Sequence, residues 1–172
     1  KQVYFEATTP TNSEFFIYMD THSKLTLEGV GMKVPEKHQS AIGMSASELT
    51  IRNSTIFSKI DLSEGSKLTL ENVHIEKFGN NTIHAKDSEV IAKNSTITGG
   101  DLEKDFPPVW LRSVIWESEN CKIELPTGTG VCLDNNVQFN SDSDRITSLN
   151  SFNSMIRAHQ ATFTEFLCVY EE

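Results

Sequence analysis

Residues 66–73 read Ser-Lys-Leu-Thr-Leu-Glu-Asn-Val, and close versions of this octapeptide occur three more times. They read Ser-Lys-Leu-Thr-Leu-Glu-Gly-Val at 23–30, Ser-Glu-Leu-Thr-Ile-Arg-Asn-Ser at 47–54 and Ser-Glu-Val-Ile-Ala-Lys-Asn-Ser at 88–95. The first apolar residue of each copy follows the previous one by 24, 19 and 22 positions. Apolar and polar residues largely alternate within the copies, and this is the two-residue period of a β-strand. The sequence therefore predicts short strands in a repeat of about 22 residues.

Two further features extend the repeat. A short apolar segment precedes each copy, at 17–19, 42–44, 60–62 and 83–85. A weaker fifth copy aligns 115–125 with 60–70, and a more degraded sixth is expected at 131–139. Leucine-rich repeats need a helical half, propeller blades are about twice as long, and a sandwich has no reason to repeat one motif in register. A coil with one repeat per turn does need that register, because its strands stack on their equivalents.

These strings resemble the right-handed parallel β-helix of the pectate-lyase-like superfold, over about Phe15 to Phe139. The resemblance implies an all-β, right-handed parallel β-helix of about 5–6 turns, which we assign to residues 1–140. Residues 141–172 break the repeat, and we expect them to form a C-terminal cap. A short helix is predicted near 146–159, because Ile146, Leu149, Phe152 or Asn153, and Ile156 have roughly helical spacing.

Two columns of the stacked repeat carry polar residues with an expected structural role. Asn53, Asn72 and Asn94 follow the strands at the point where the chain must turn a corner, and asparagine tolerates the left-handed backbone that a corner requires. We expect their side chains to form a hydrogen-bonded ladder. Just before them lie residues of alternating sign, which would hold the register of the stack: Glu28, Arg52, Glu71 and Lys93.

Composition limits the classes of function. The 172 residues include 15 Lys plus Arg and 24 Asp plus Glu, a net charge of −9, which disfavours a nucleic-acid-binding surface spread over the molecule. No apolar run approaches the ~18 residues that span a bilayer. The chain begins at Lys1 without a signal-peptide pattern, so we expect an excised domain or a processed chain.

The sequence lacks the motifs of the enzymes that share this architecture. Galacturonan hydrolases carry Asn-Thr-Asp, Asp-Asp, Gly-His-Gly and Arg-Ile-Lys, and none of these strings is present. A pectate lyase needs a calcium-binding set of acidic residues and an arginine base, and no comparable cluster lies on one strand face. The histidines show no metal spacing, and no phosphate-binding or nucleophile-elbow motif occurs. We expect no catalytic residue, no metal and no cofactor, although carboxylates from different turns can still pair.

The best candidate for a binding feature is the insertion between the fourth and fifth copies. Asp101, Glu103 and Asp105 in this segment suit a cation or a basic partner, and Trp110 and Trp116 suit stacking on a sugar. The alternative is a solvated acidic loop with both tryptophans packed against the coil.

Cysteine and histidine leave alternatives open. Cys121 and Cys132 are close enough in sequence to close a small loop by a disulfide, or they are buried thiols. His74 and His84 fall on consecutive turns, either as near neighbours or as separate surface residues.

The function expected from these features is that of a non-catalytic binding or adhesion module, secreted or on a cell surface. It resembles the passenger domains of autotransporters and other secreted adhesins, and it would recognise a glycan or a host or cell-surface protein. The first alternative is a polysaccharide-active lyase or hydrolase, or an inactive relative of one. The second is a segment of a phage tail spike.

Overall fold

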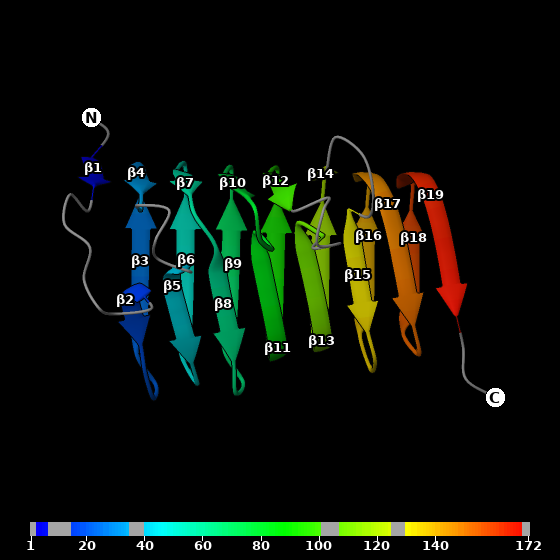
Figure 1. Ribbon diagram of the computed structural model, residues 1–172, viewed down its shortest axis with the longest axis horizontal. Helices are drawn as coiled ribbons and strands as arrows, with labels where there is room; N and C mark the ends of the chain where they lie inside the picture. The colour runs from blue at the N-terminus through cyan, green and yellow to red at the C-terminus, as the bar shows by residue number, and fades with distance from the viewer. Residues whose placement is uncertain (1–2, 7–14, 35–39, 101–106, 125–129, 170–172) are drawn as a thin grey trace.

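Short strands separated by corners build a parallel β-solenoid of at least five turns, as the computed structural model shows (Figure 1). The structure describes residues 3–6, 15–34, 40–100, 107–124 and 130–169. Within them every strand pairing is parallel, and each strand stacks on its equivalent in the next turn. The parallel β-helix expected from the repeat is confirmed, and its right hand stays a prediction.

Three ladders of strands form the walls of the coil. The first contains the early part of β11 (Ile83–Lys93) and β13 (Val109–Glu119), the late part of β17 (Arg145–Phe152) and β19 (Thr162–Val169), and four short strands: β2 (Phe15–Met19), β5 (Ser40–Ser45), β8 (Ile60–Ser63) and β15 (Val131–Asp134).

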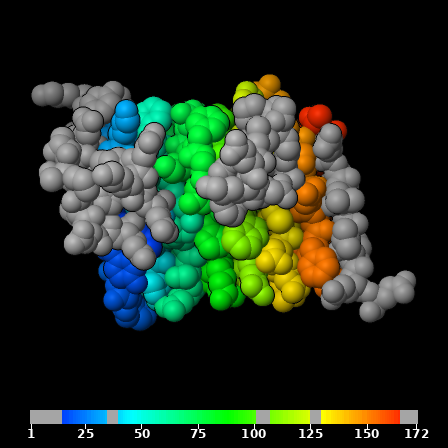
Figure 2. Space-filling model, in the orientation of Figure 1, coloured from blue at the N-terminus to red at the C-terminus, as the bar shows by residue number. Residues whose placement is uncertain are grey.

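The second ladder holds the octapeptide repeat. It combines the late part of β11 and β13 with β3 (Lys24–Glu28), β6 (Glu48–Arg52), β9 (Lys67–Glu71), β16 (Gln138–Asp142) and β18 (Met155–His159). The third ladder combines the early part of β17 and β19 with β1 (Val3–Glu6), β4 (Val30–Lys33), β7 (Thr55–Phe57), β10 (His74–Phe78), β12 (Thr96–Gly100) and β14 (Lys122–Glu124). The turns follow one another as successive bands of colour along the long axis (Figure 2).

Inward side chains from all three ladders form one continuous core. In the second ladder the first inward column begins with Leu25, Leu49, Leu68 and Val90, as the repeat predicts, and continues with Trp116 and Phe139. The second inward column runs from large to small residues: Leu27, Ile51, Leu70, Ala92, Ser118, Ser141 and Ala158. The small residues stand beside the large aromatic rings, so the two columns compensate each other in volume.

The predicted helix near 146–159 is wrong, because this stretch forms β17 and β18. Ile146 faces the core from the third ladder, whereas Leu149 faces it from the first and Ile156 from the second. Their three-residue and seven-residue spacings arise from corners between walls and not from a helical turn. Residues of the expected cap thus extend the ladders as far as Val169.

The register expected for the fifth copy is also wrong. Trp116 pairs with Val90, and Ile123 pairs with Ile97, so the copy is shifted relative to the alignment of 115–125 with 60–70. Like β11, β13 passes from the first ladder to the second without the turn residues that separate β8 from β9. Its corner is made by Ser113 alone, at φ 52°.

Candidate functional site

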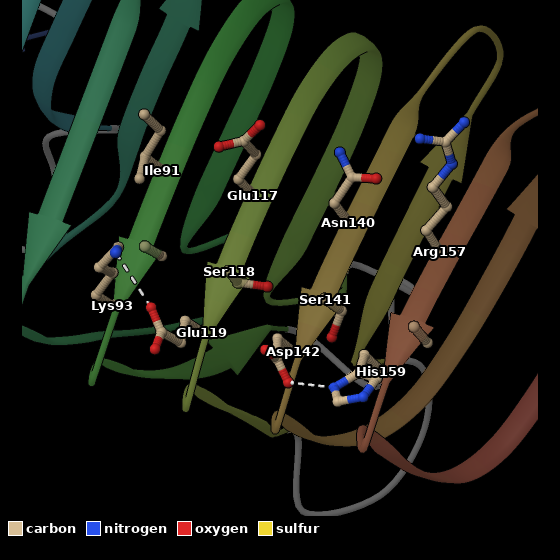
Figure 3. Close-up of a pocket in the computed structure, with 12 residues that line it drawn as sticks. Ile91, Lys93, Glu117, Ser118, Glu119, Asn140, Ser141, Asp142, Arg157 and His159 are labelled. Carbon is tan, nitrogen blue, oxygen red and sulfur yellow. Dashed lines mark hydrogen bonds and ion pairs between the residues drawn. The ribbon is translucent and has the colours of Figure 1, made fainter.

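A shallow hollow of about 570 Å³ lies on the outer face of the second ladder, where β11, β13, β16 and β18 run side by side (Figure 3). Its surface is made by two outward columns and its floor by the small residues of the inward column. The hollow lies over the turns on which alanine and serine replace the leucine and isoleucine of the earlier turns in that inward column.

The middle outward column supplies the free polar groups of the hollow. Glu117, Asn140 and Arg157 lie in register on neighbouring strands, in a row that Figure 3 shows crossing β13, β16 and β18. None of these three side chains makes a hydrogen bond or ion pair with any part of the chain that the structure describes. On the earlier turns the same column holds short threonines, at Thr26, Thr50 and Thr69.

The outermost column is, by contrast, paired. Lys93 Nζ lies 3.1 Å from Glu119 Oε2, and His159 Nδ1 lies 3.1 Å from Asp142 Oδ1 (Figure 3). The hydrogen bond with His159 lowers the pKa of Asp142. Lys93 and Glu119 continue the alternating ladder predicted from the sequence, in which Arg52 Nε lies 2.7 Å from Glu71 Oε2, whereas Asp142 beside Glu119 breaks the alternation. The two pairs restrain the side chains at the edge of the hollow.

Beneath the floor lies a carboxylate that receives three hydrogen bonds. Asp144 is fully buried; it accepts from the hydroxyls of Ser118 and Ser141 and, at 2.7 Å, from the backbone N–H of Cys121. Burial raises the pKa of Asp144, although these hydrogen bonds act in the opposite direction. Both serines line the hollow, so Asp144 fixes the hydroxyls of its floor from within (Figure 3).

Trp116 is fully buried, so the expectation that it stacks on a sugar is wrong. Its ring stacks on Phe139 with centroids 5.8 Å apart, and its Nε1 donates to Ser118 Oγ at 2.7 Å. The residue stands in the inward column of the second ladder because of the shifted register of β13. The indole supports the floor of the hollow from inside the coil.

Trp110 lies on another wall, facing outward from the first ladder. Its ring stacks on that of His84, with centroids 4.7 Å apart and planes 14° apart. His84 Nδ1 lies 2.9 Å from Asp61 Oδ1 on the preceding turn, so the three residues form one row across β8, β11 and β13. His74 lies on the third ladder, which leaves His74 and His84 as separate residues.

Asp61 is the centre of this second cluster. Lys59 Nζ lies 2.7 Å from Asp61 Oδ1, and Ser40 Oγ donates to Asp61 Oδ2. Burial acts to raise the pKa of Asp61, but the hydrogen bond from His84 and the charge of Lys59 outweigh it and lower the pKa. Nothing in the sequence pattern predicts this cluster, because Lys59 and Asp61 meet His84 only through the stacking of two turns.

The remaining sequence candidates fall into three groups. Asp101, Glu103 and Asp105 lie outside the described residues. Cys121 is a free thiol, buried in the core, whereas Cys132 faces outward between the inward Val131 and Leu133. Cys121 lies inside the coil at the corner before the third ladder, whereas Cys132 lies outside on the first ladder, and no disulfide joins them.

The third group is the asparagine column. Asn53, Asn72 and Asn94 have φ of 49°, 54° and 49°, in the left-handed region. Asn72 Nδ2 donates to Asn53 Oδ1 at 3.2 Å. Asn120 continues the column and donates from Nδ2 to Asn94 Oδ1 at 2.8 Å. The structure places these residues at corners and not at either cluster.

The described residues form neither a metal centre nor a membrane-spanning helix. Within them, no group of three or more His, Cys, Asp or Glu side chains is arranged to hold a metal ion. Nor does this part of the chain contain a helix long and apolar enough to cross a membrane. Comparisons with protein-family models, with curated proteins and with solved structures found no match.

Proposed function

We propose that this protein is a binding module, secreted or displayed at a cell surface in the manner of an adhesin, that holds a glycan in the hollow on the second ladder. The observation that carries the proposal is the row formed by Glu117, Asn140 and Arg157, whose side chains are unpaired among the described residues. Polar side chains that are held on a rigid wall and lack partners are available to a ligand.

The chemistry of the row favours a glycan over an apolar partner. Glu117 offers acceptors, Arg157 offers donors, and Asn140 between them offers both. Hydroxyl groups of a sugar act as donors and as acceptors, so they can satisfy all three side chains. Neighbouring strands of a ladder lie ~4.8 Å apart, so the row presents one polar group for every such step along the axis. The hollow is open, which allows an extended polymer to lie across it (Figure 3).

The charges in the hollow favour binding without turnover. Glycoside hydrolysis uses two carboxyl groups that flank the scissile bond. Glu119 is paired with Lys93, and Asp142 with His159. Among the lining residues, this leaves Glu117 as the unpaired carboxylate, and it lacks a second one to act with. Asp144 cannot take that place because it is fully buried.

A glycan array followed by titration calorimetry on the selected oligosaccharide tests the proposal. We expect Glu117→Gln, Asn140→Ala and Arg157→Ala each to weaken binding about tenfold or more, which corresponds to ~1.4 kcal/mol. Thr50→Ala and Thr69→Ala are matched controls, because they alter the same outward column on earlier turns. Affinity that is unchanged in all three hollow variants would refute the site. Release of new reducing ends from the bound polysaccharide would refute binding without turnover.

A further inference from the structure

The second cluster, on the first ladder, has the components of a general base. Asp61, His84 and Trp110 lie in register on three neighbouring strands and point outward from the coil. Nδ1 of His84 and Oδ1 of Asp61 are 2.9 Å apart, a hydrogen-bonding distance. When Nδ1 carries the proton of this bond, Nε2 of the neutral imidazole holds a lone pair.

The carboxylate that orients the ring is itself held in place. Lys59 contacts Asp61 Oδ1 at 2.7 Å, and Ser40 donates to Oδ2, so both oxygens are engaged. The Lys59 side chain is only 12 % exposed, which keeps its charge close to the carboxylate. A carboxylate with this surrounding stays ionised, and an ionised carboxylate stabilises an imidazole that takes up a proton.

The ring of His84 is fixed and still accessible. Trp110 stacks on it with centroids 4.7 Å apart, which restricts rotation of the imidazole. The side chain is 31 % exposed, and its Nε2 has no partner among the described residues. We propose that Asp61 and His84 form a general-base pair that hydrolyses acyl esters on the first ladder, separate from the glycan-binding hollow.

The step needs only water and the ester. Nε2 of His84 takes a proton from a water molecule as the water oxygen bonds to the acyl carbon. The tetrahedral intermediate collapses, and the bond between the acyl carbon and the alcohol oxygen breaks. The imidazolium returns its proton to the leaving alkoxide, so the products are a carboxylic acid and an alcohol. Asp61 stabilises the imidazolium and is a positioning residue.

The molecule contains its own control for this pair. His74 and Glu76 form a looser imidazole–carboxylate pair on the third ladder, with Nε2 and Oε2 3.7 Å apart. No described lysine pairs with Glu76. The ring of Phe57 meets that of His74 edge-on, with planes 74° apart, and does not stack on it. The control pair therefore has the same kinds of group without the stacked ring and the paired lysine.

Hydrolysis of p-nitrophenyl acetate by the whole chain tests the inference. We expect His84→Gln to lower the initial rate at least tenfold, and His74→Gln to leave it unchanged. Asp61→Asn is expected to lower kcat and to leave KM unchanged, whereas Glu76→Gln changes neither. Equal rates for the wild type and His84→Gln overturn the proposal, as does an equal loss in His74→Gln.

A second measurement uses the unmodified fold. Diethyl pyrocarbonate acylates accessible imidazoles, and mass spectrometry identifies which histidines carry the label. We expect the rate to fall in proportion to labelling of His84 and to return when hydroxylamine removes the label. Hydrolysis that persists after complete labelling of His84 overturns the proposal, even if the variants fail to fold.

Discussion

Replacement of Asp144 tests the account of the floor of the hollow. Asp144→Ala removes the acceptor for three buried donors: the backbone N–H of Cys121 and the hydroxyls of Ser118 and Ser141. A buried donor that loses its partner costs ~1–3 kcal/mol. At the lower end of that range, the three donors predict a loss of about 3 kcal/mol in the free energy of unfolding, a large fraction of the ~5–15 kcal/mol of an ordinary domain.

Asp144→Asn is the matched variant. Its Oδ1 still accepts from Cys121, and its amide group donates to a serine oxygen, so we expect it to lose less than half as much as the alanine variant. Urea unfolding at pH 7, followed by circular dichroism, measures both. If the free energy of unfolding of the alanine variant lies within about 1 kcal/mol of the wild-type value, the cost assigned to the three lost hydrogen bonds is wrong.

The same residue predicts a dependence on pH. The pKa of Asp144 is raised in the folded state, so between the unfolded pKa and the folded pKa the folded chain binds more protons. The stability contributed by this group is therefore present at low pH and is lost as pH rises through the folded pKa. Asp144→Asn removes that loss, so its stability relative to the wild type should improve as pH rises over this window. A difference that does not change with pH would contradict the assigned direction.

Three further predictions concern the corner, the charged ladder and the buried thiol. Asn72→Ala leaves φ 54° to a residue without the short polar side chain that lets asparagine adopt the left-handed region, and it removes the bond to Asn53, so we expect a loss of about 1–2 kcal/mol in urea unfolding, whereas Asn72→Gly should lose less. Arg52→Ala breaks an exposed pair with Glu71, and we expect no resolvable change in stability at 1 M salt, where a clear loss would show that the ladder does more than hold register. Burial raises the pKa of Cys121 to about 11, so Ellman's reagent at pH 8 should label it, as mapped by mass spectrometry, only after unfolding.

The architecture was predictable because the octapeptide that forms the earlier turns of the second ladder recurs visibly along the sequence. Leu49 and Leu68 share a column, as the alignment predicts, and Asn53 and Asn72 turn successive corners. The prediction failed at β13, because residues 115–125 resemble residues 60–70 in sequence but stack on other positions of the coil. There a shift in register moved Trp116 from an expected surface position into the core.

The two clusters were harder to predict for a different reason. Asp61 and His84 are 23 positions apart, and Glu117 and Arg157 are 40 apart, so their proximity depends on the register of several turns. Each residue alone fits an ordinary outward strand position. A signal was present in the second ladder, where the outward threonines of Thr26, Thr50 and Thr69 give way to longer polar side chains. This change of side chain can be recognised only once the residues that share the column have been identified.

The stacking of parallel strands also determines how the molecule responds to force. β1 and β19 lie at opposite ends of the long axis, and the hydrogen bonds between ladder strands run along that axis (Figure 1). A pull that separates the two ends loads these bonds in tension, one turn after another, rather than shearing many at once. The coil should therefore unwind turn by turn at low force and extend as a compliant tether.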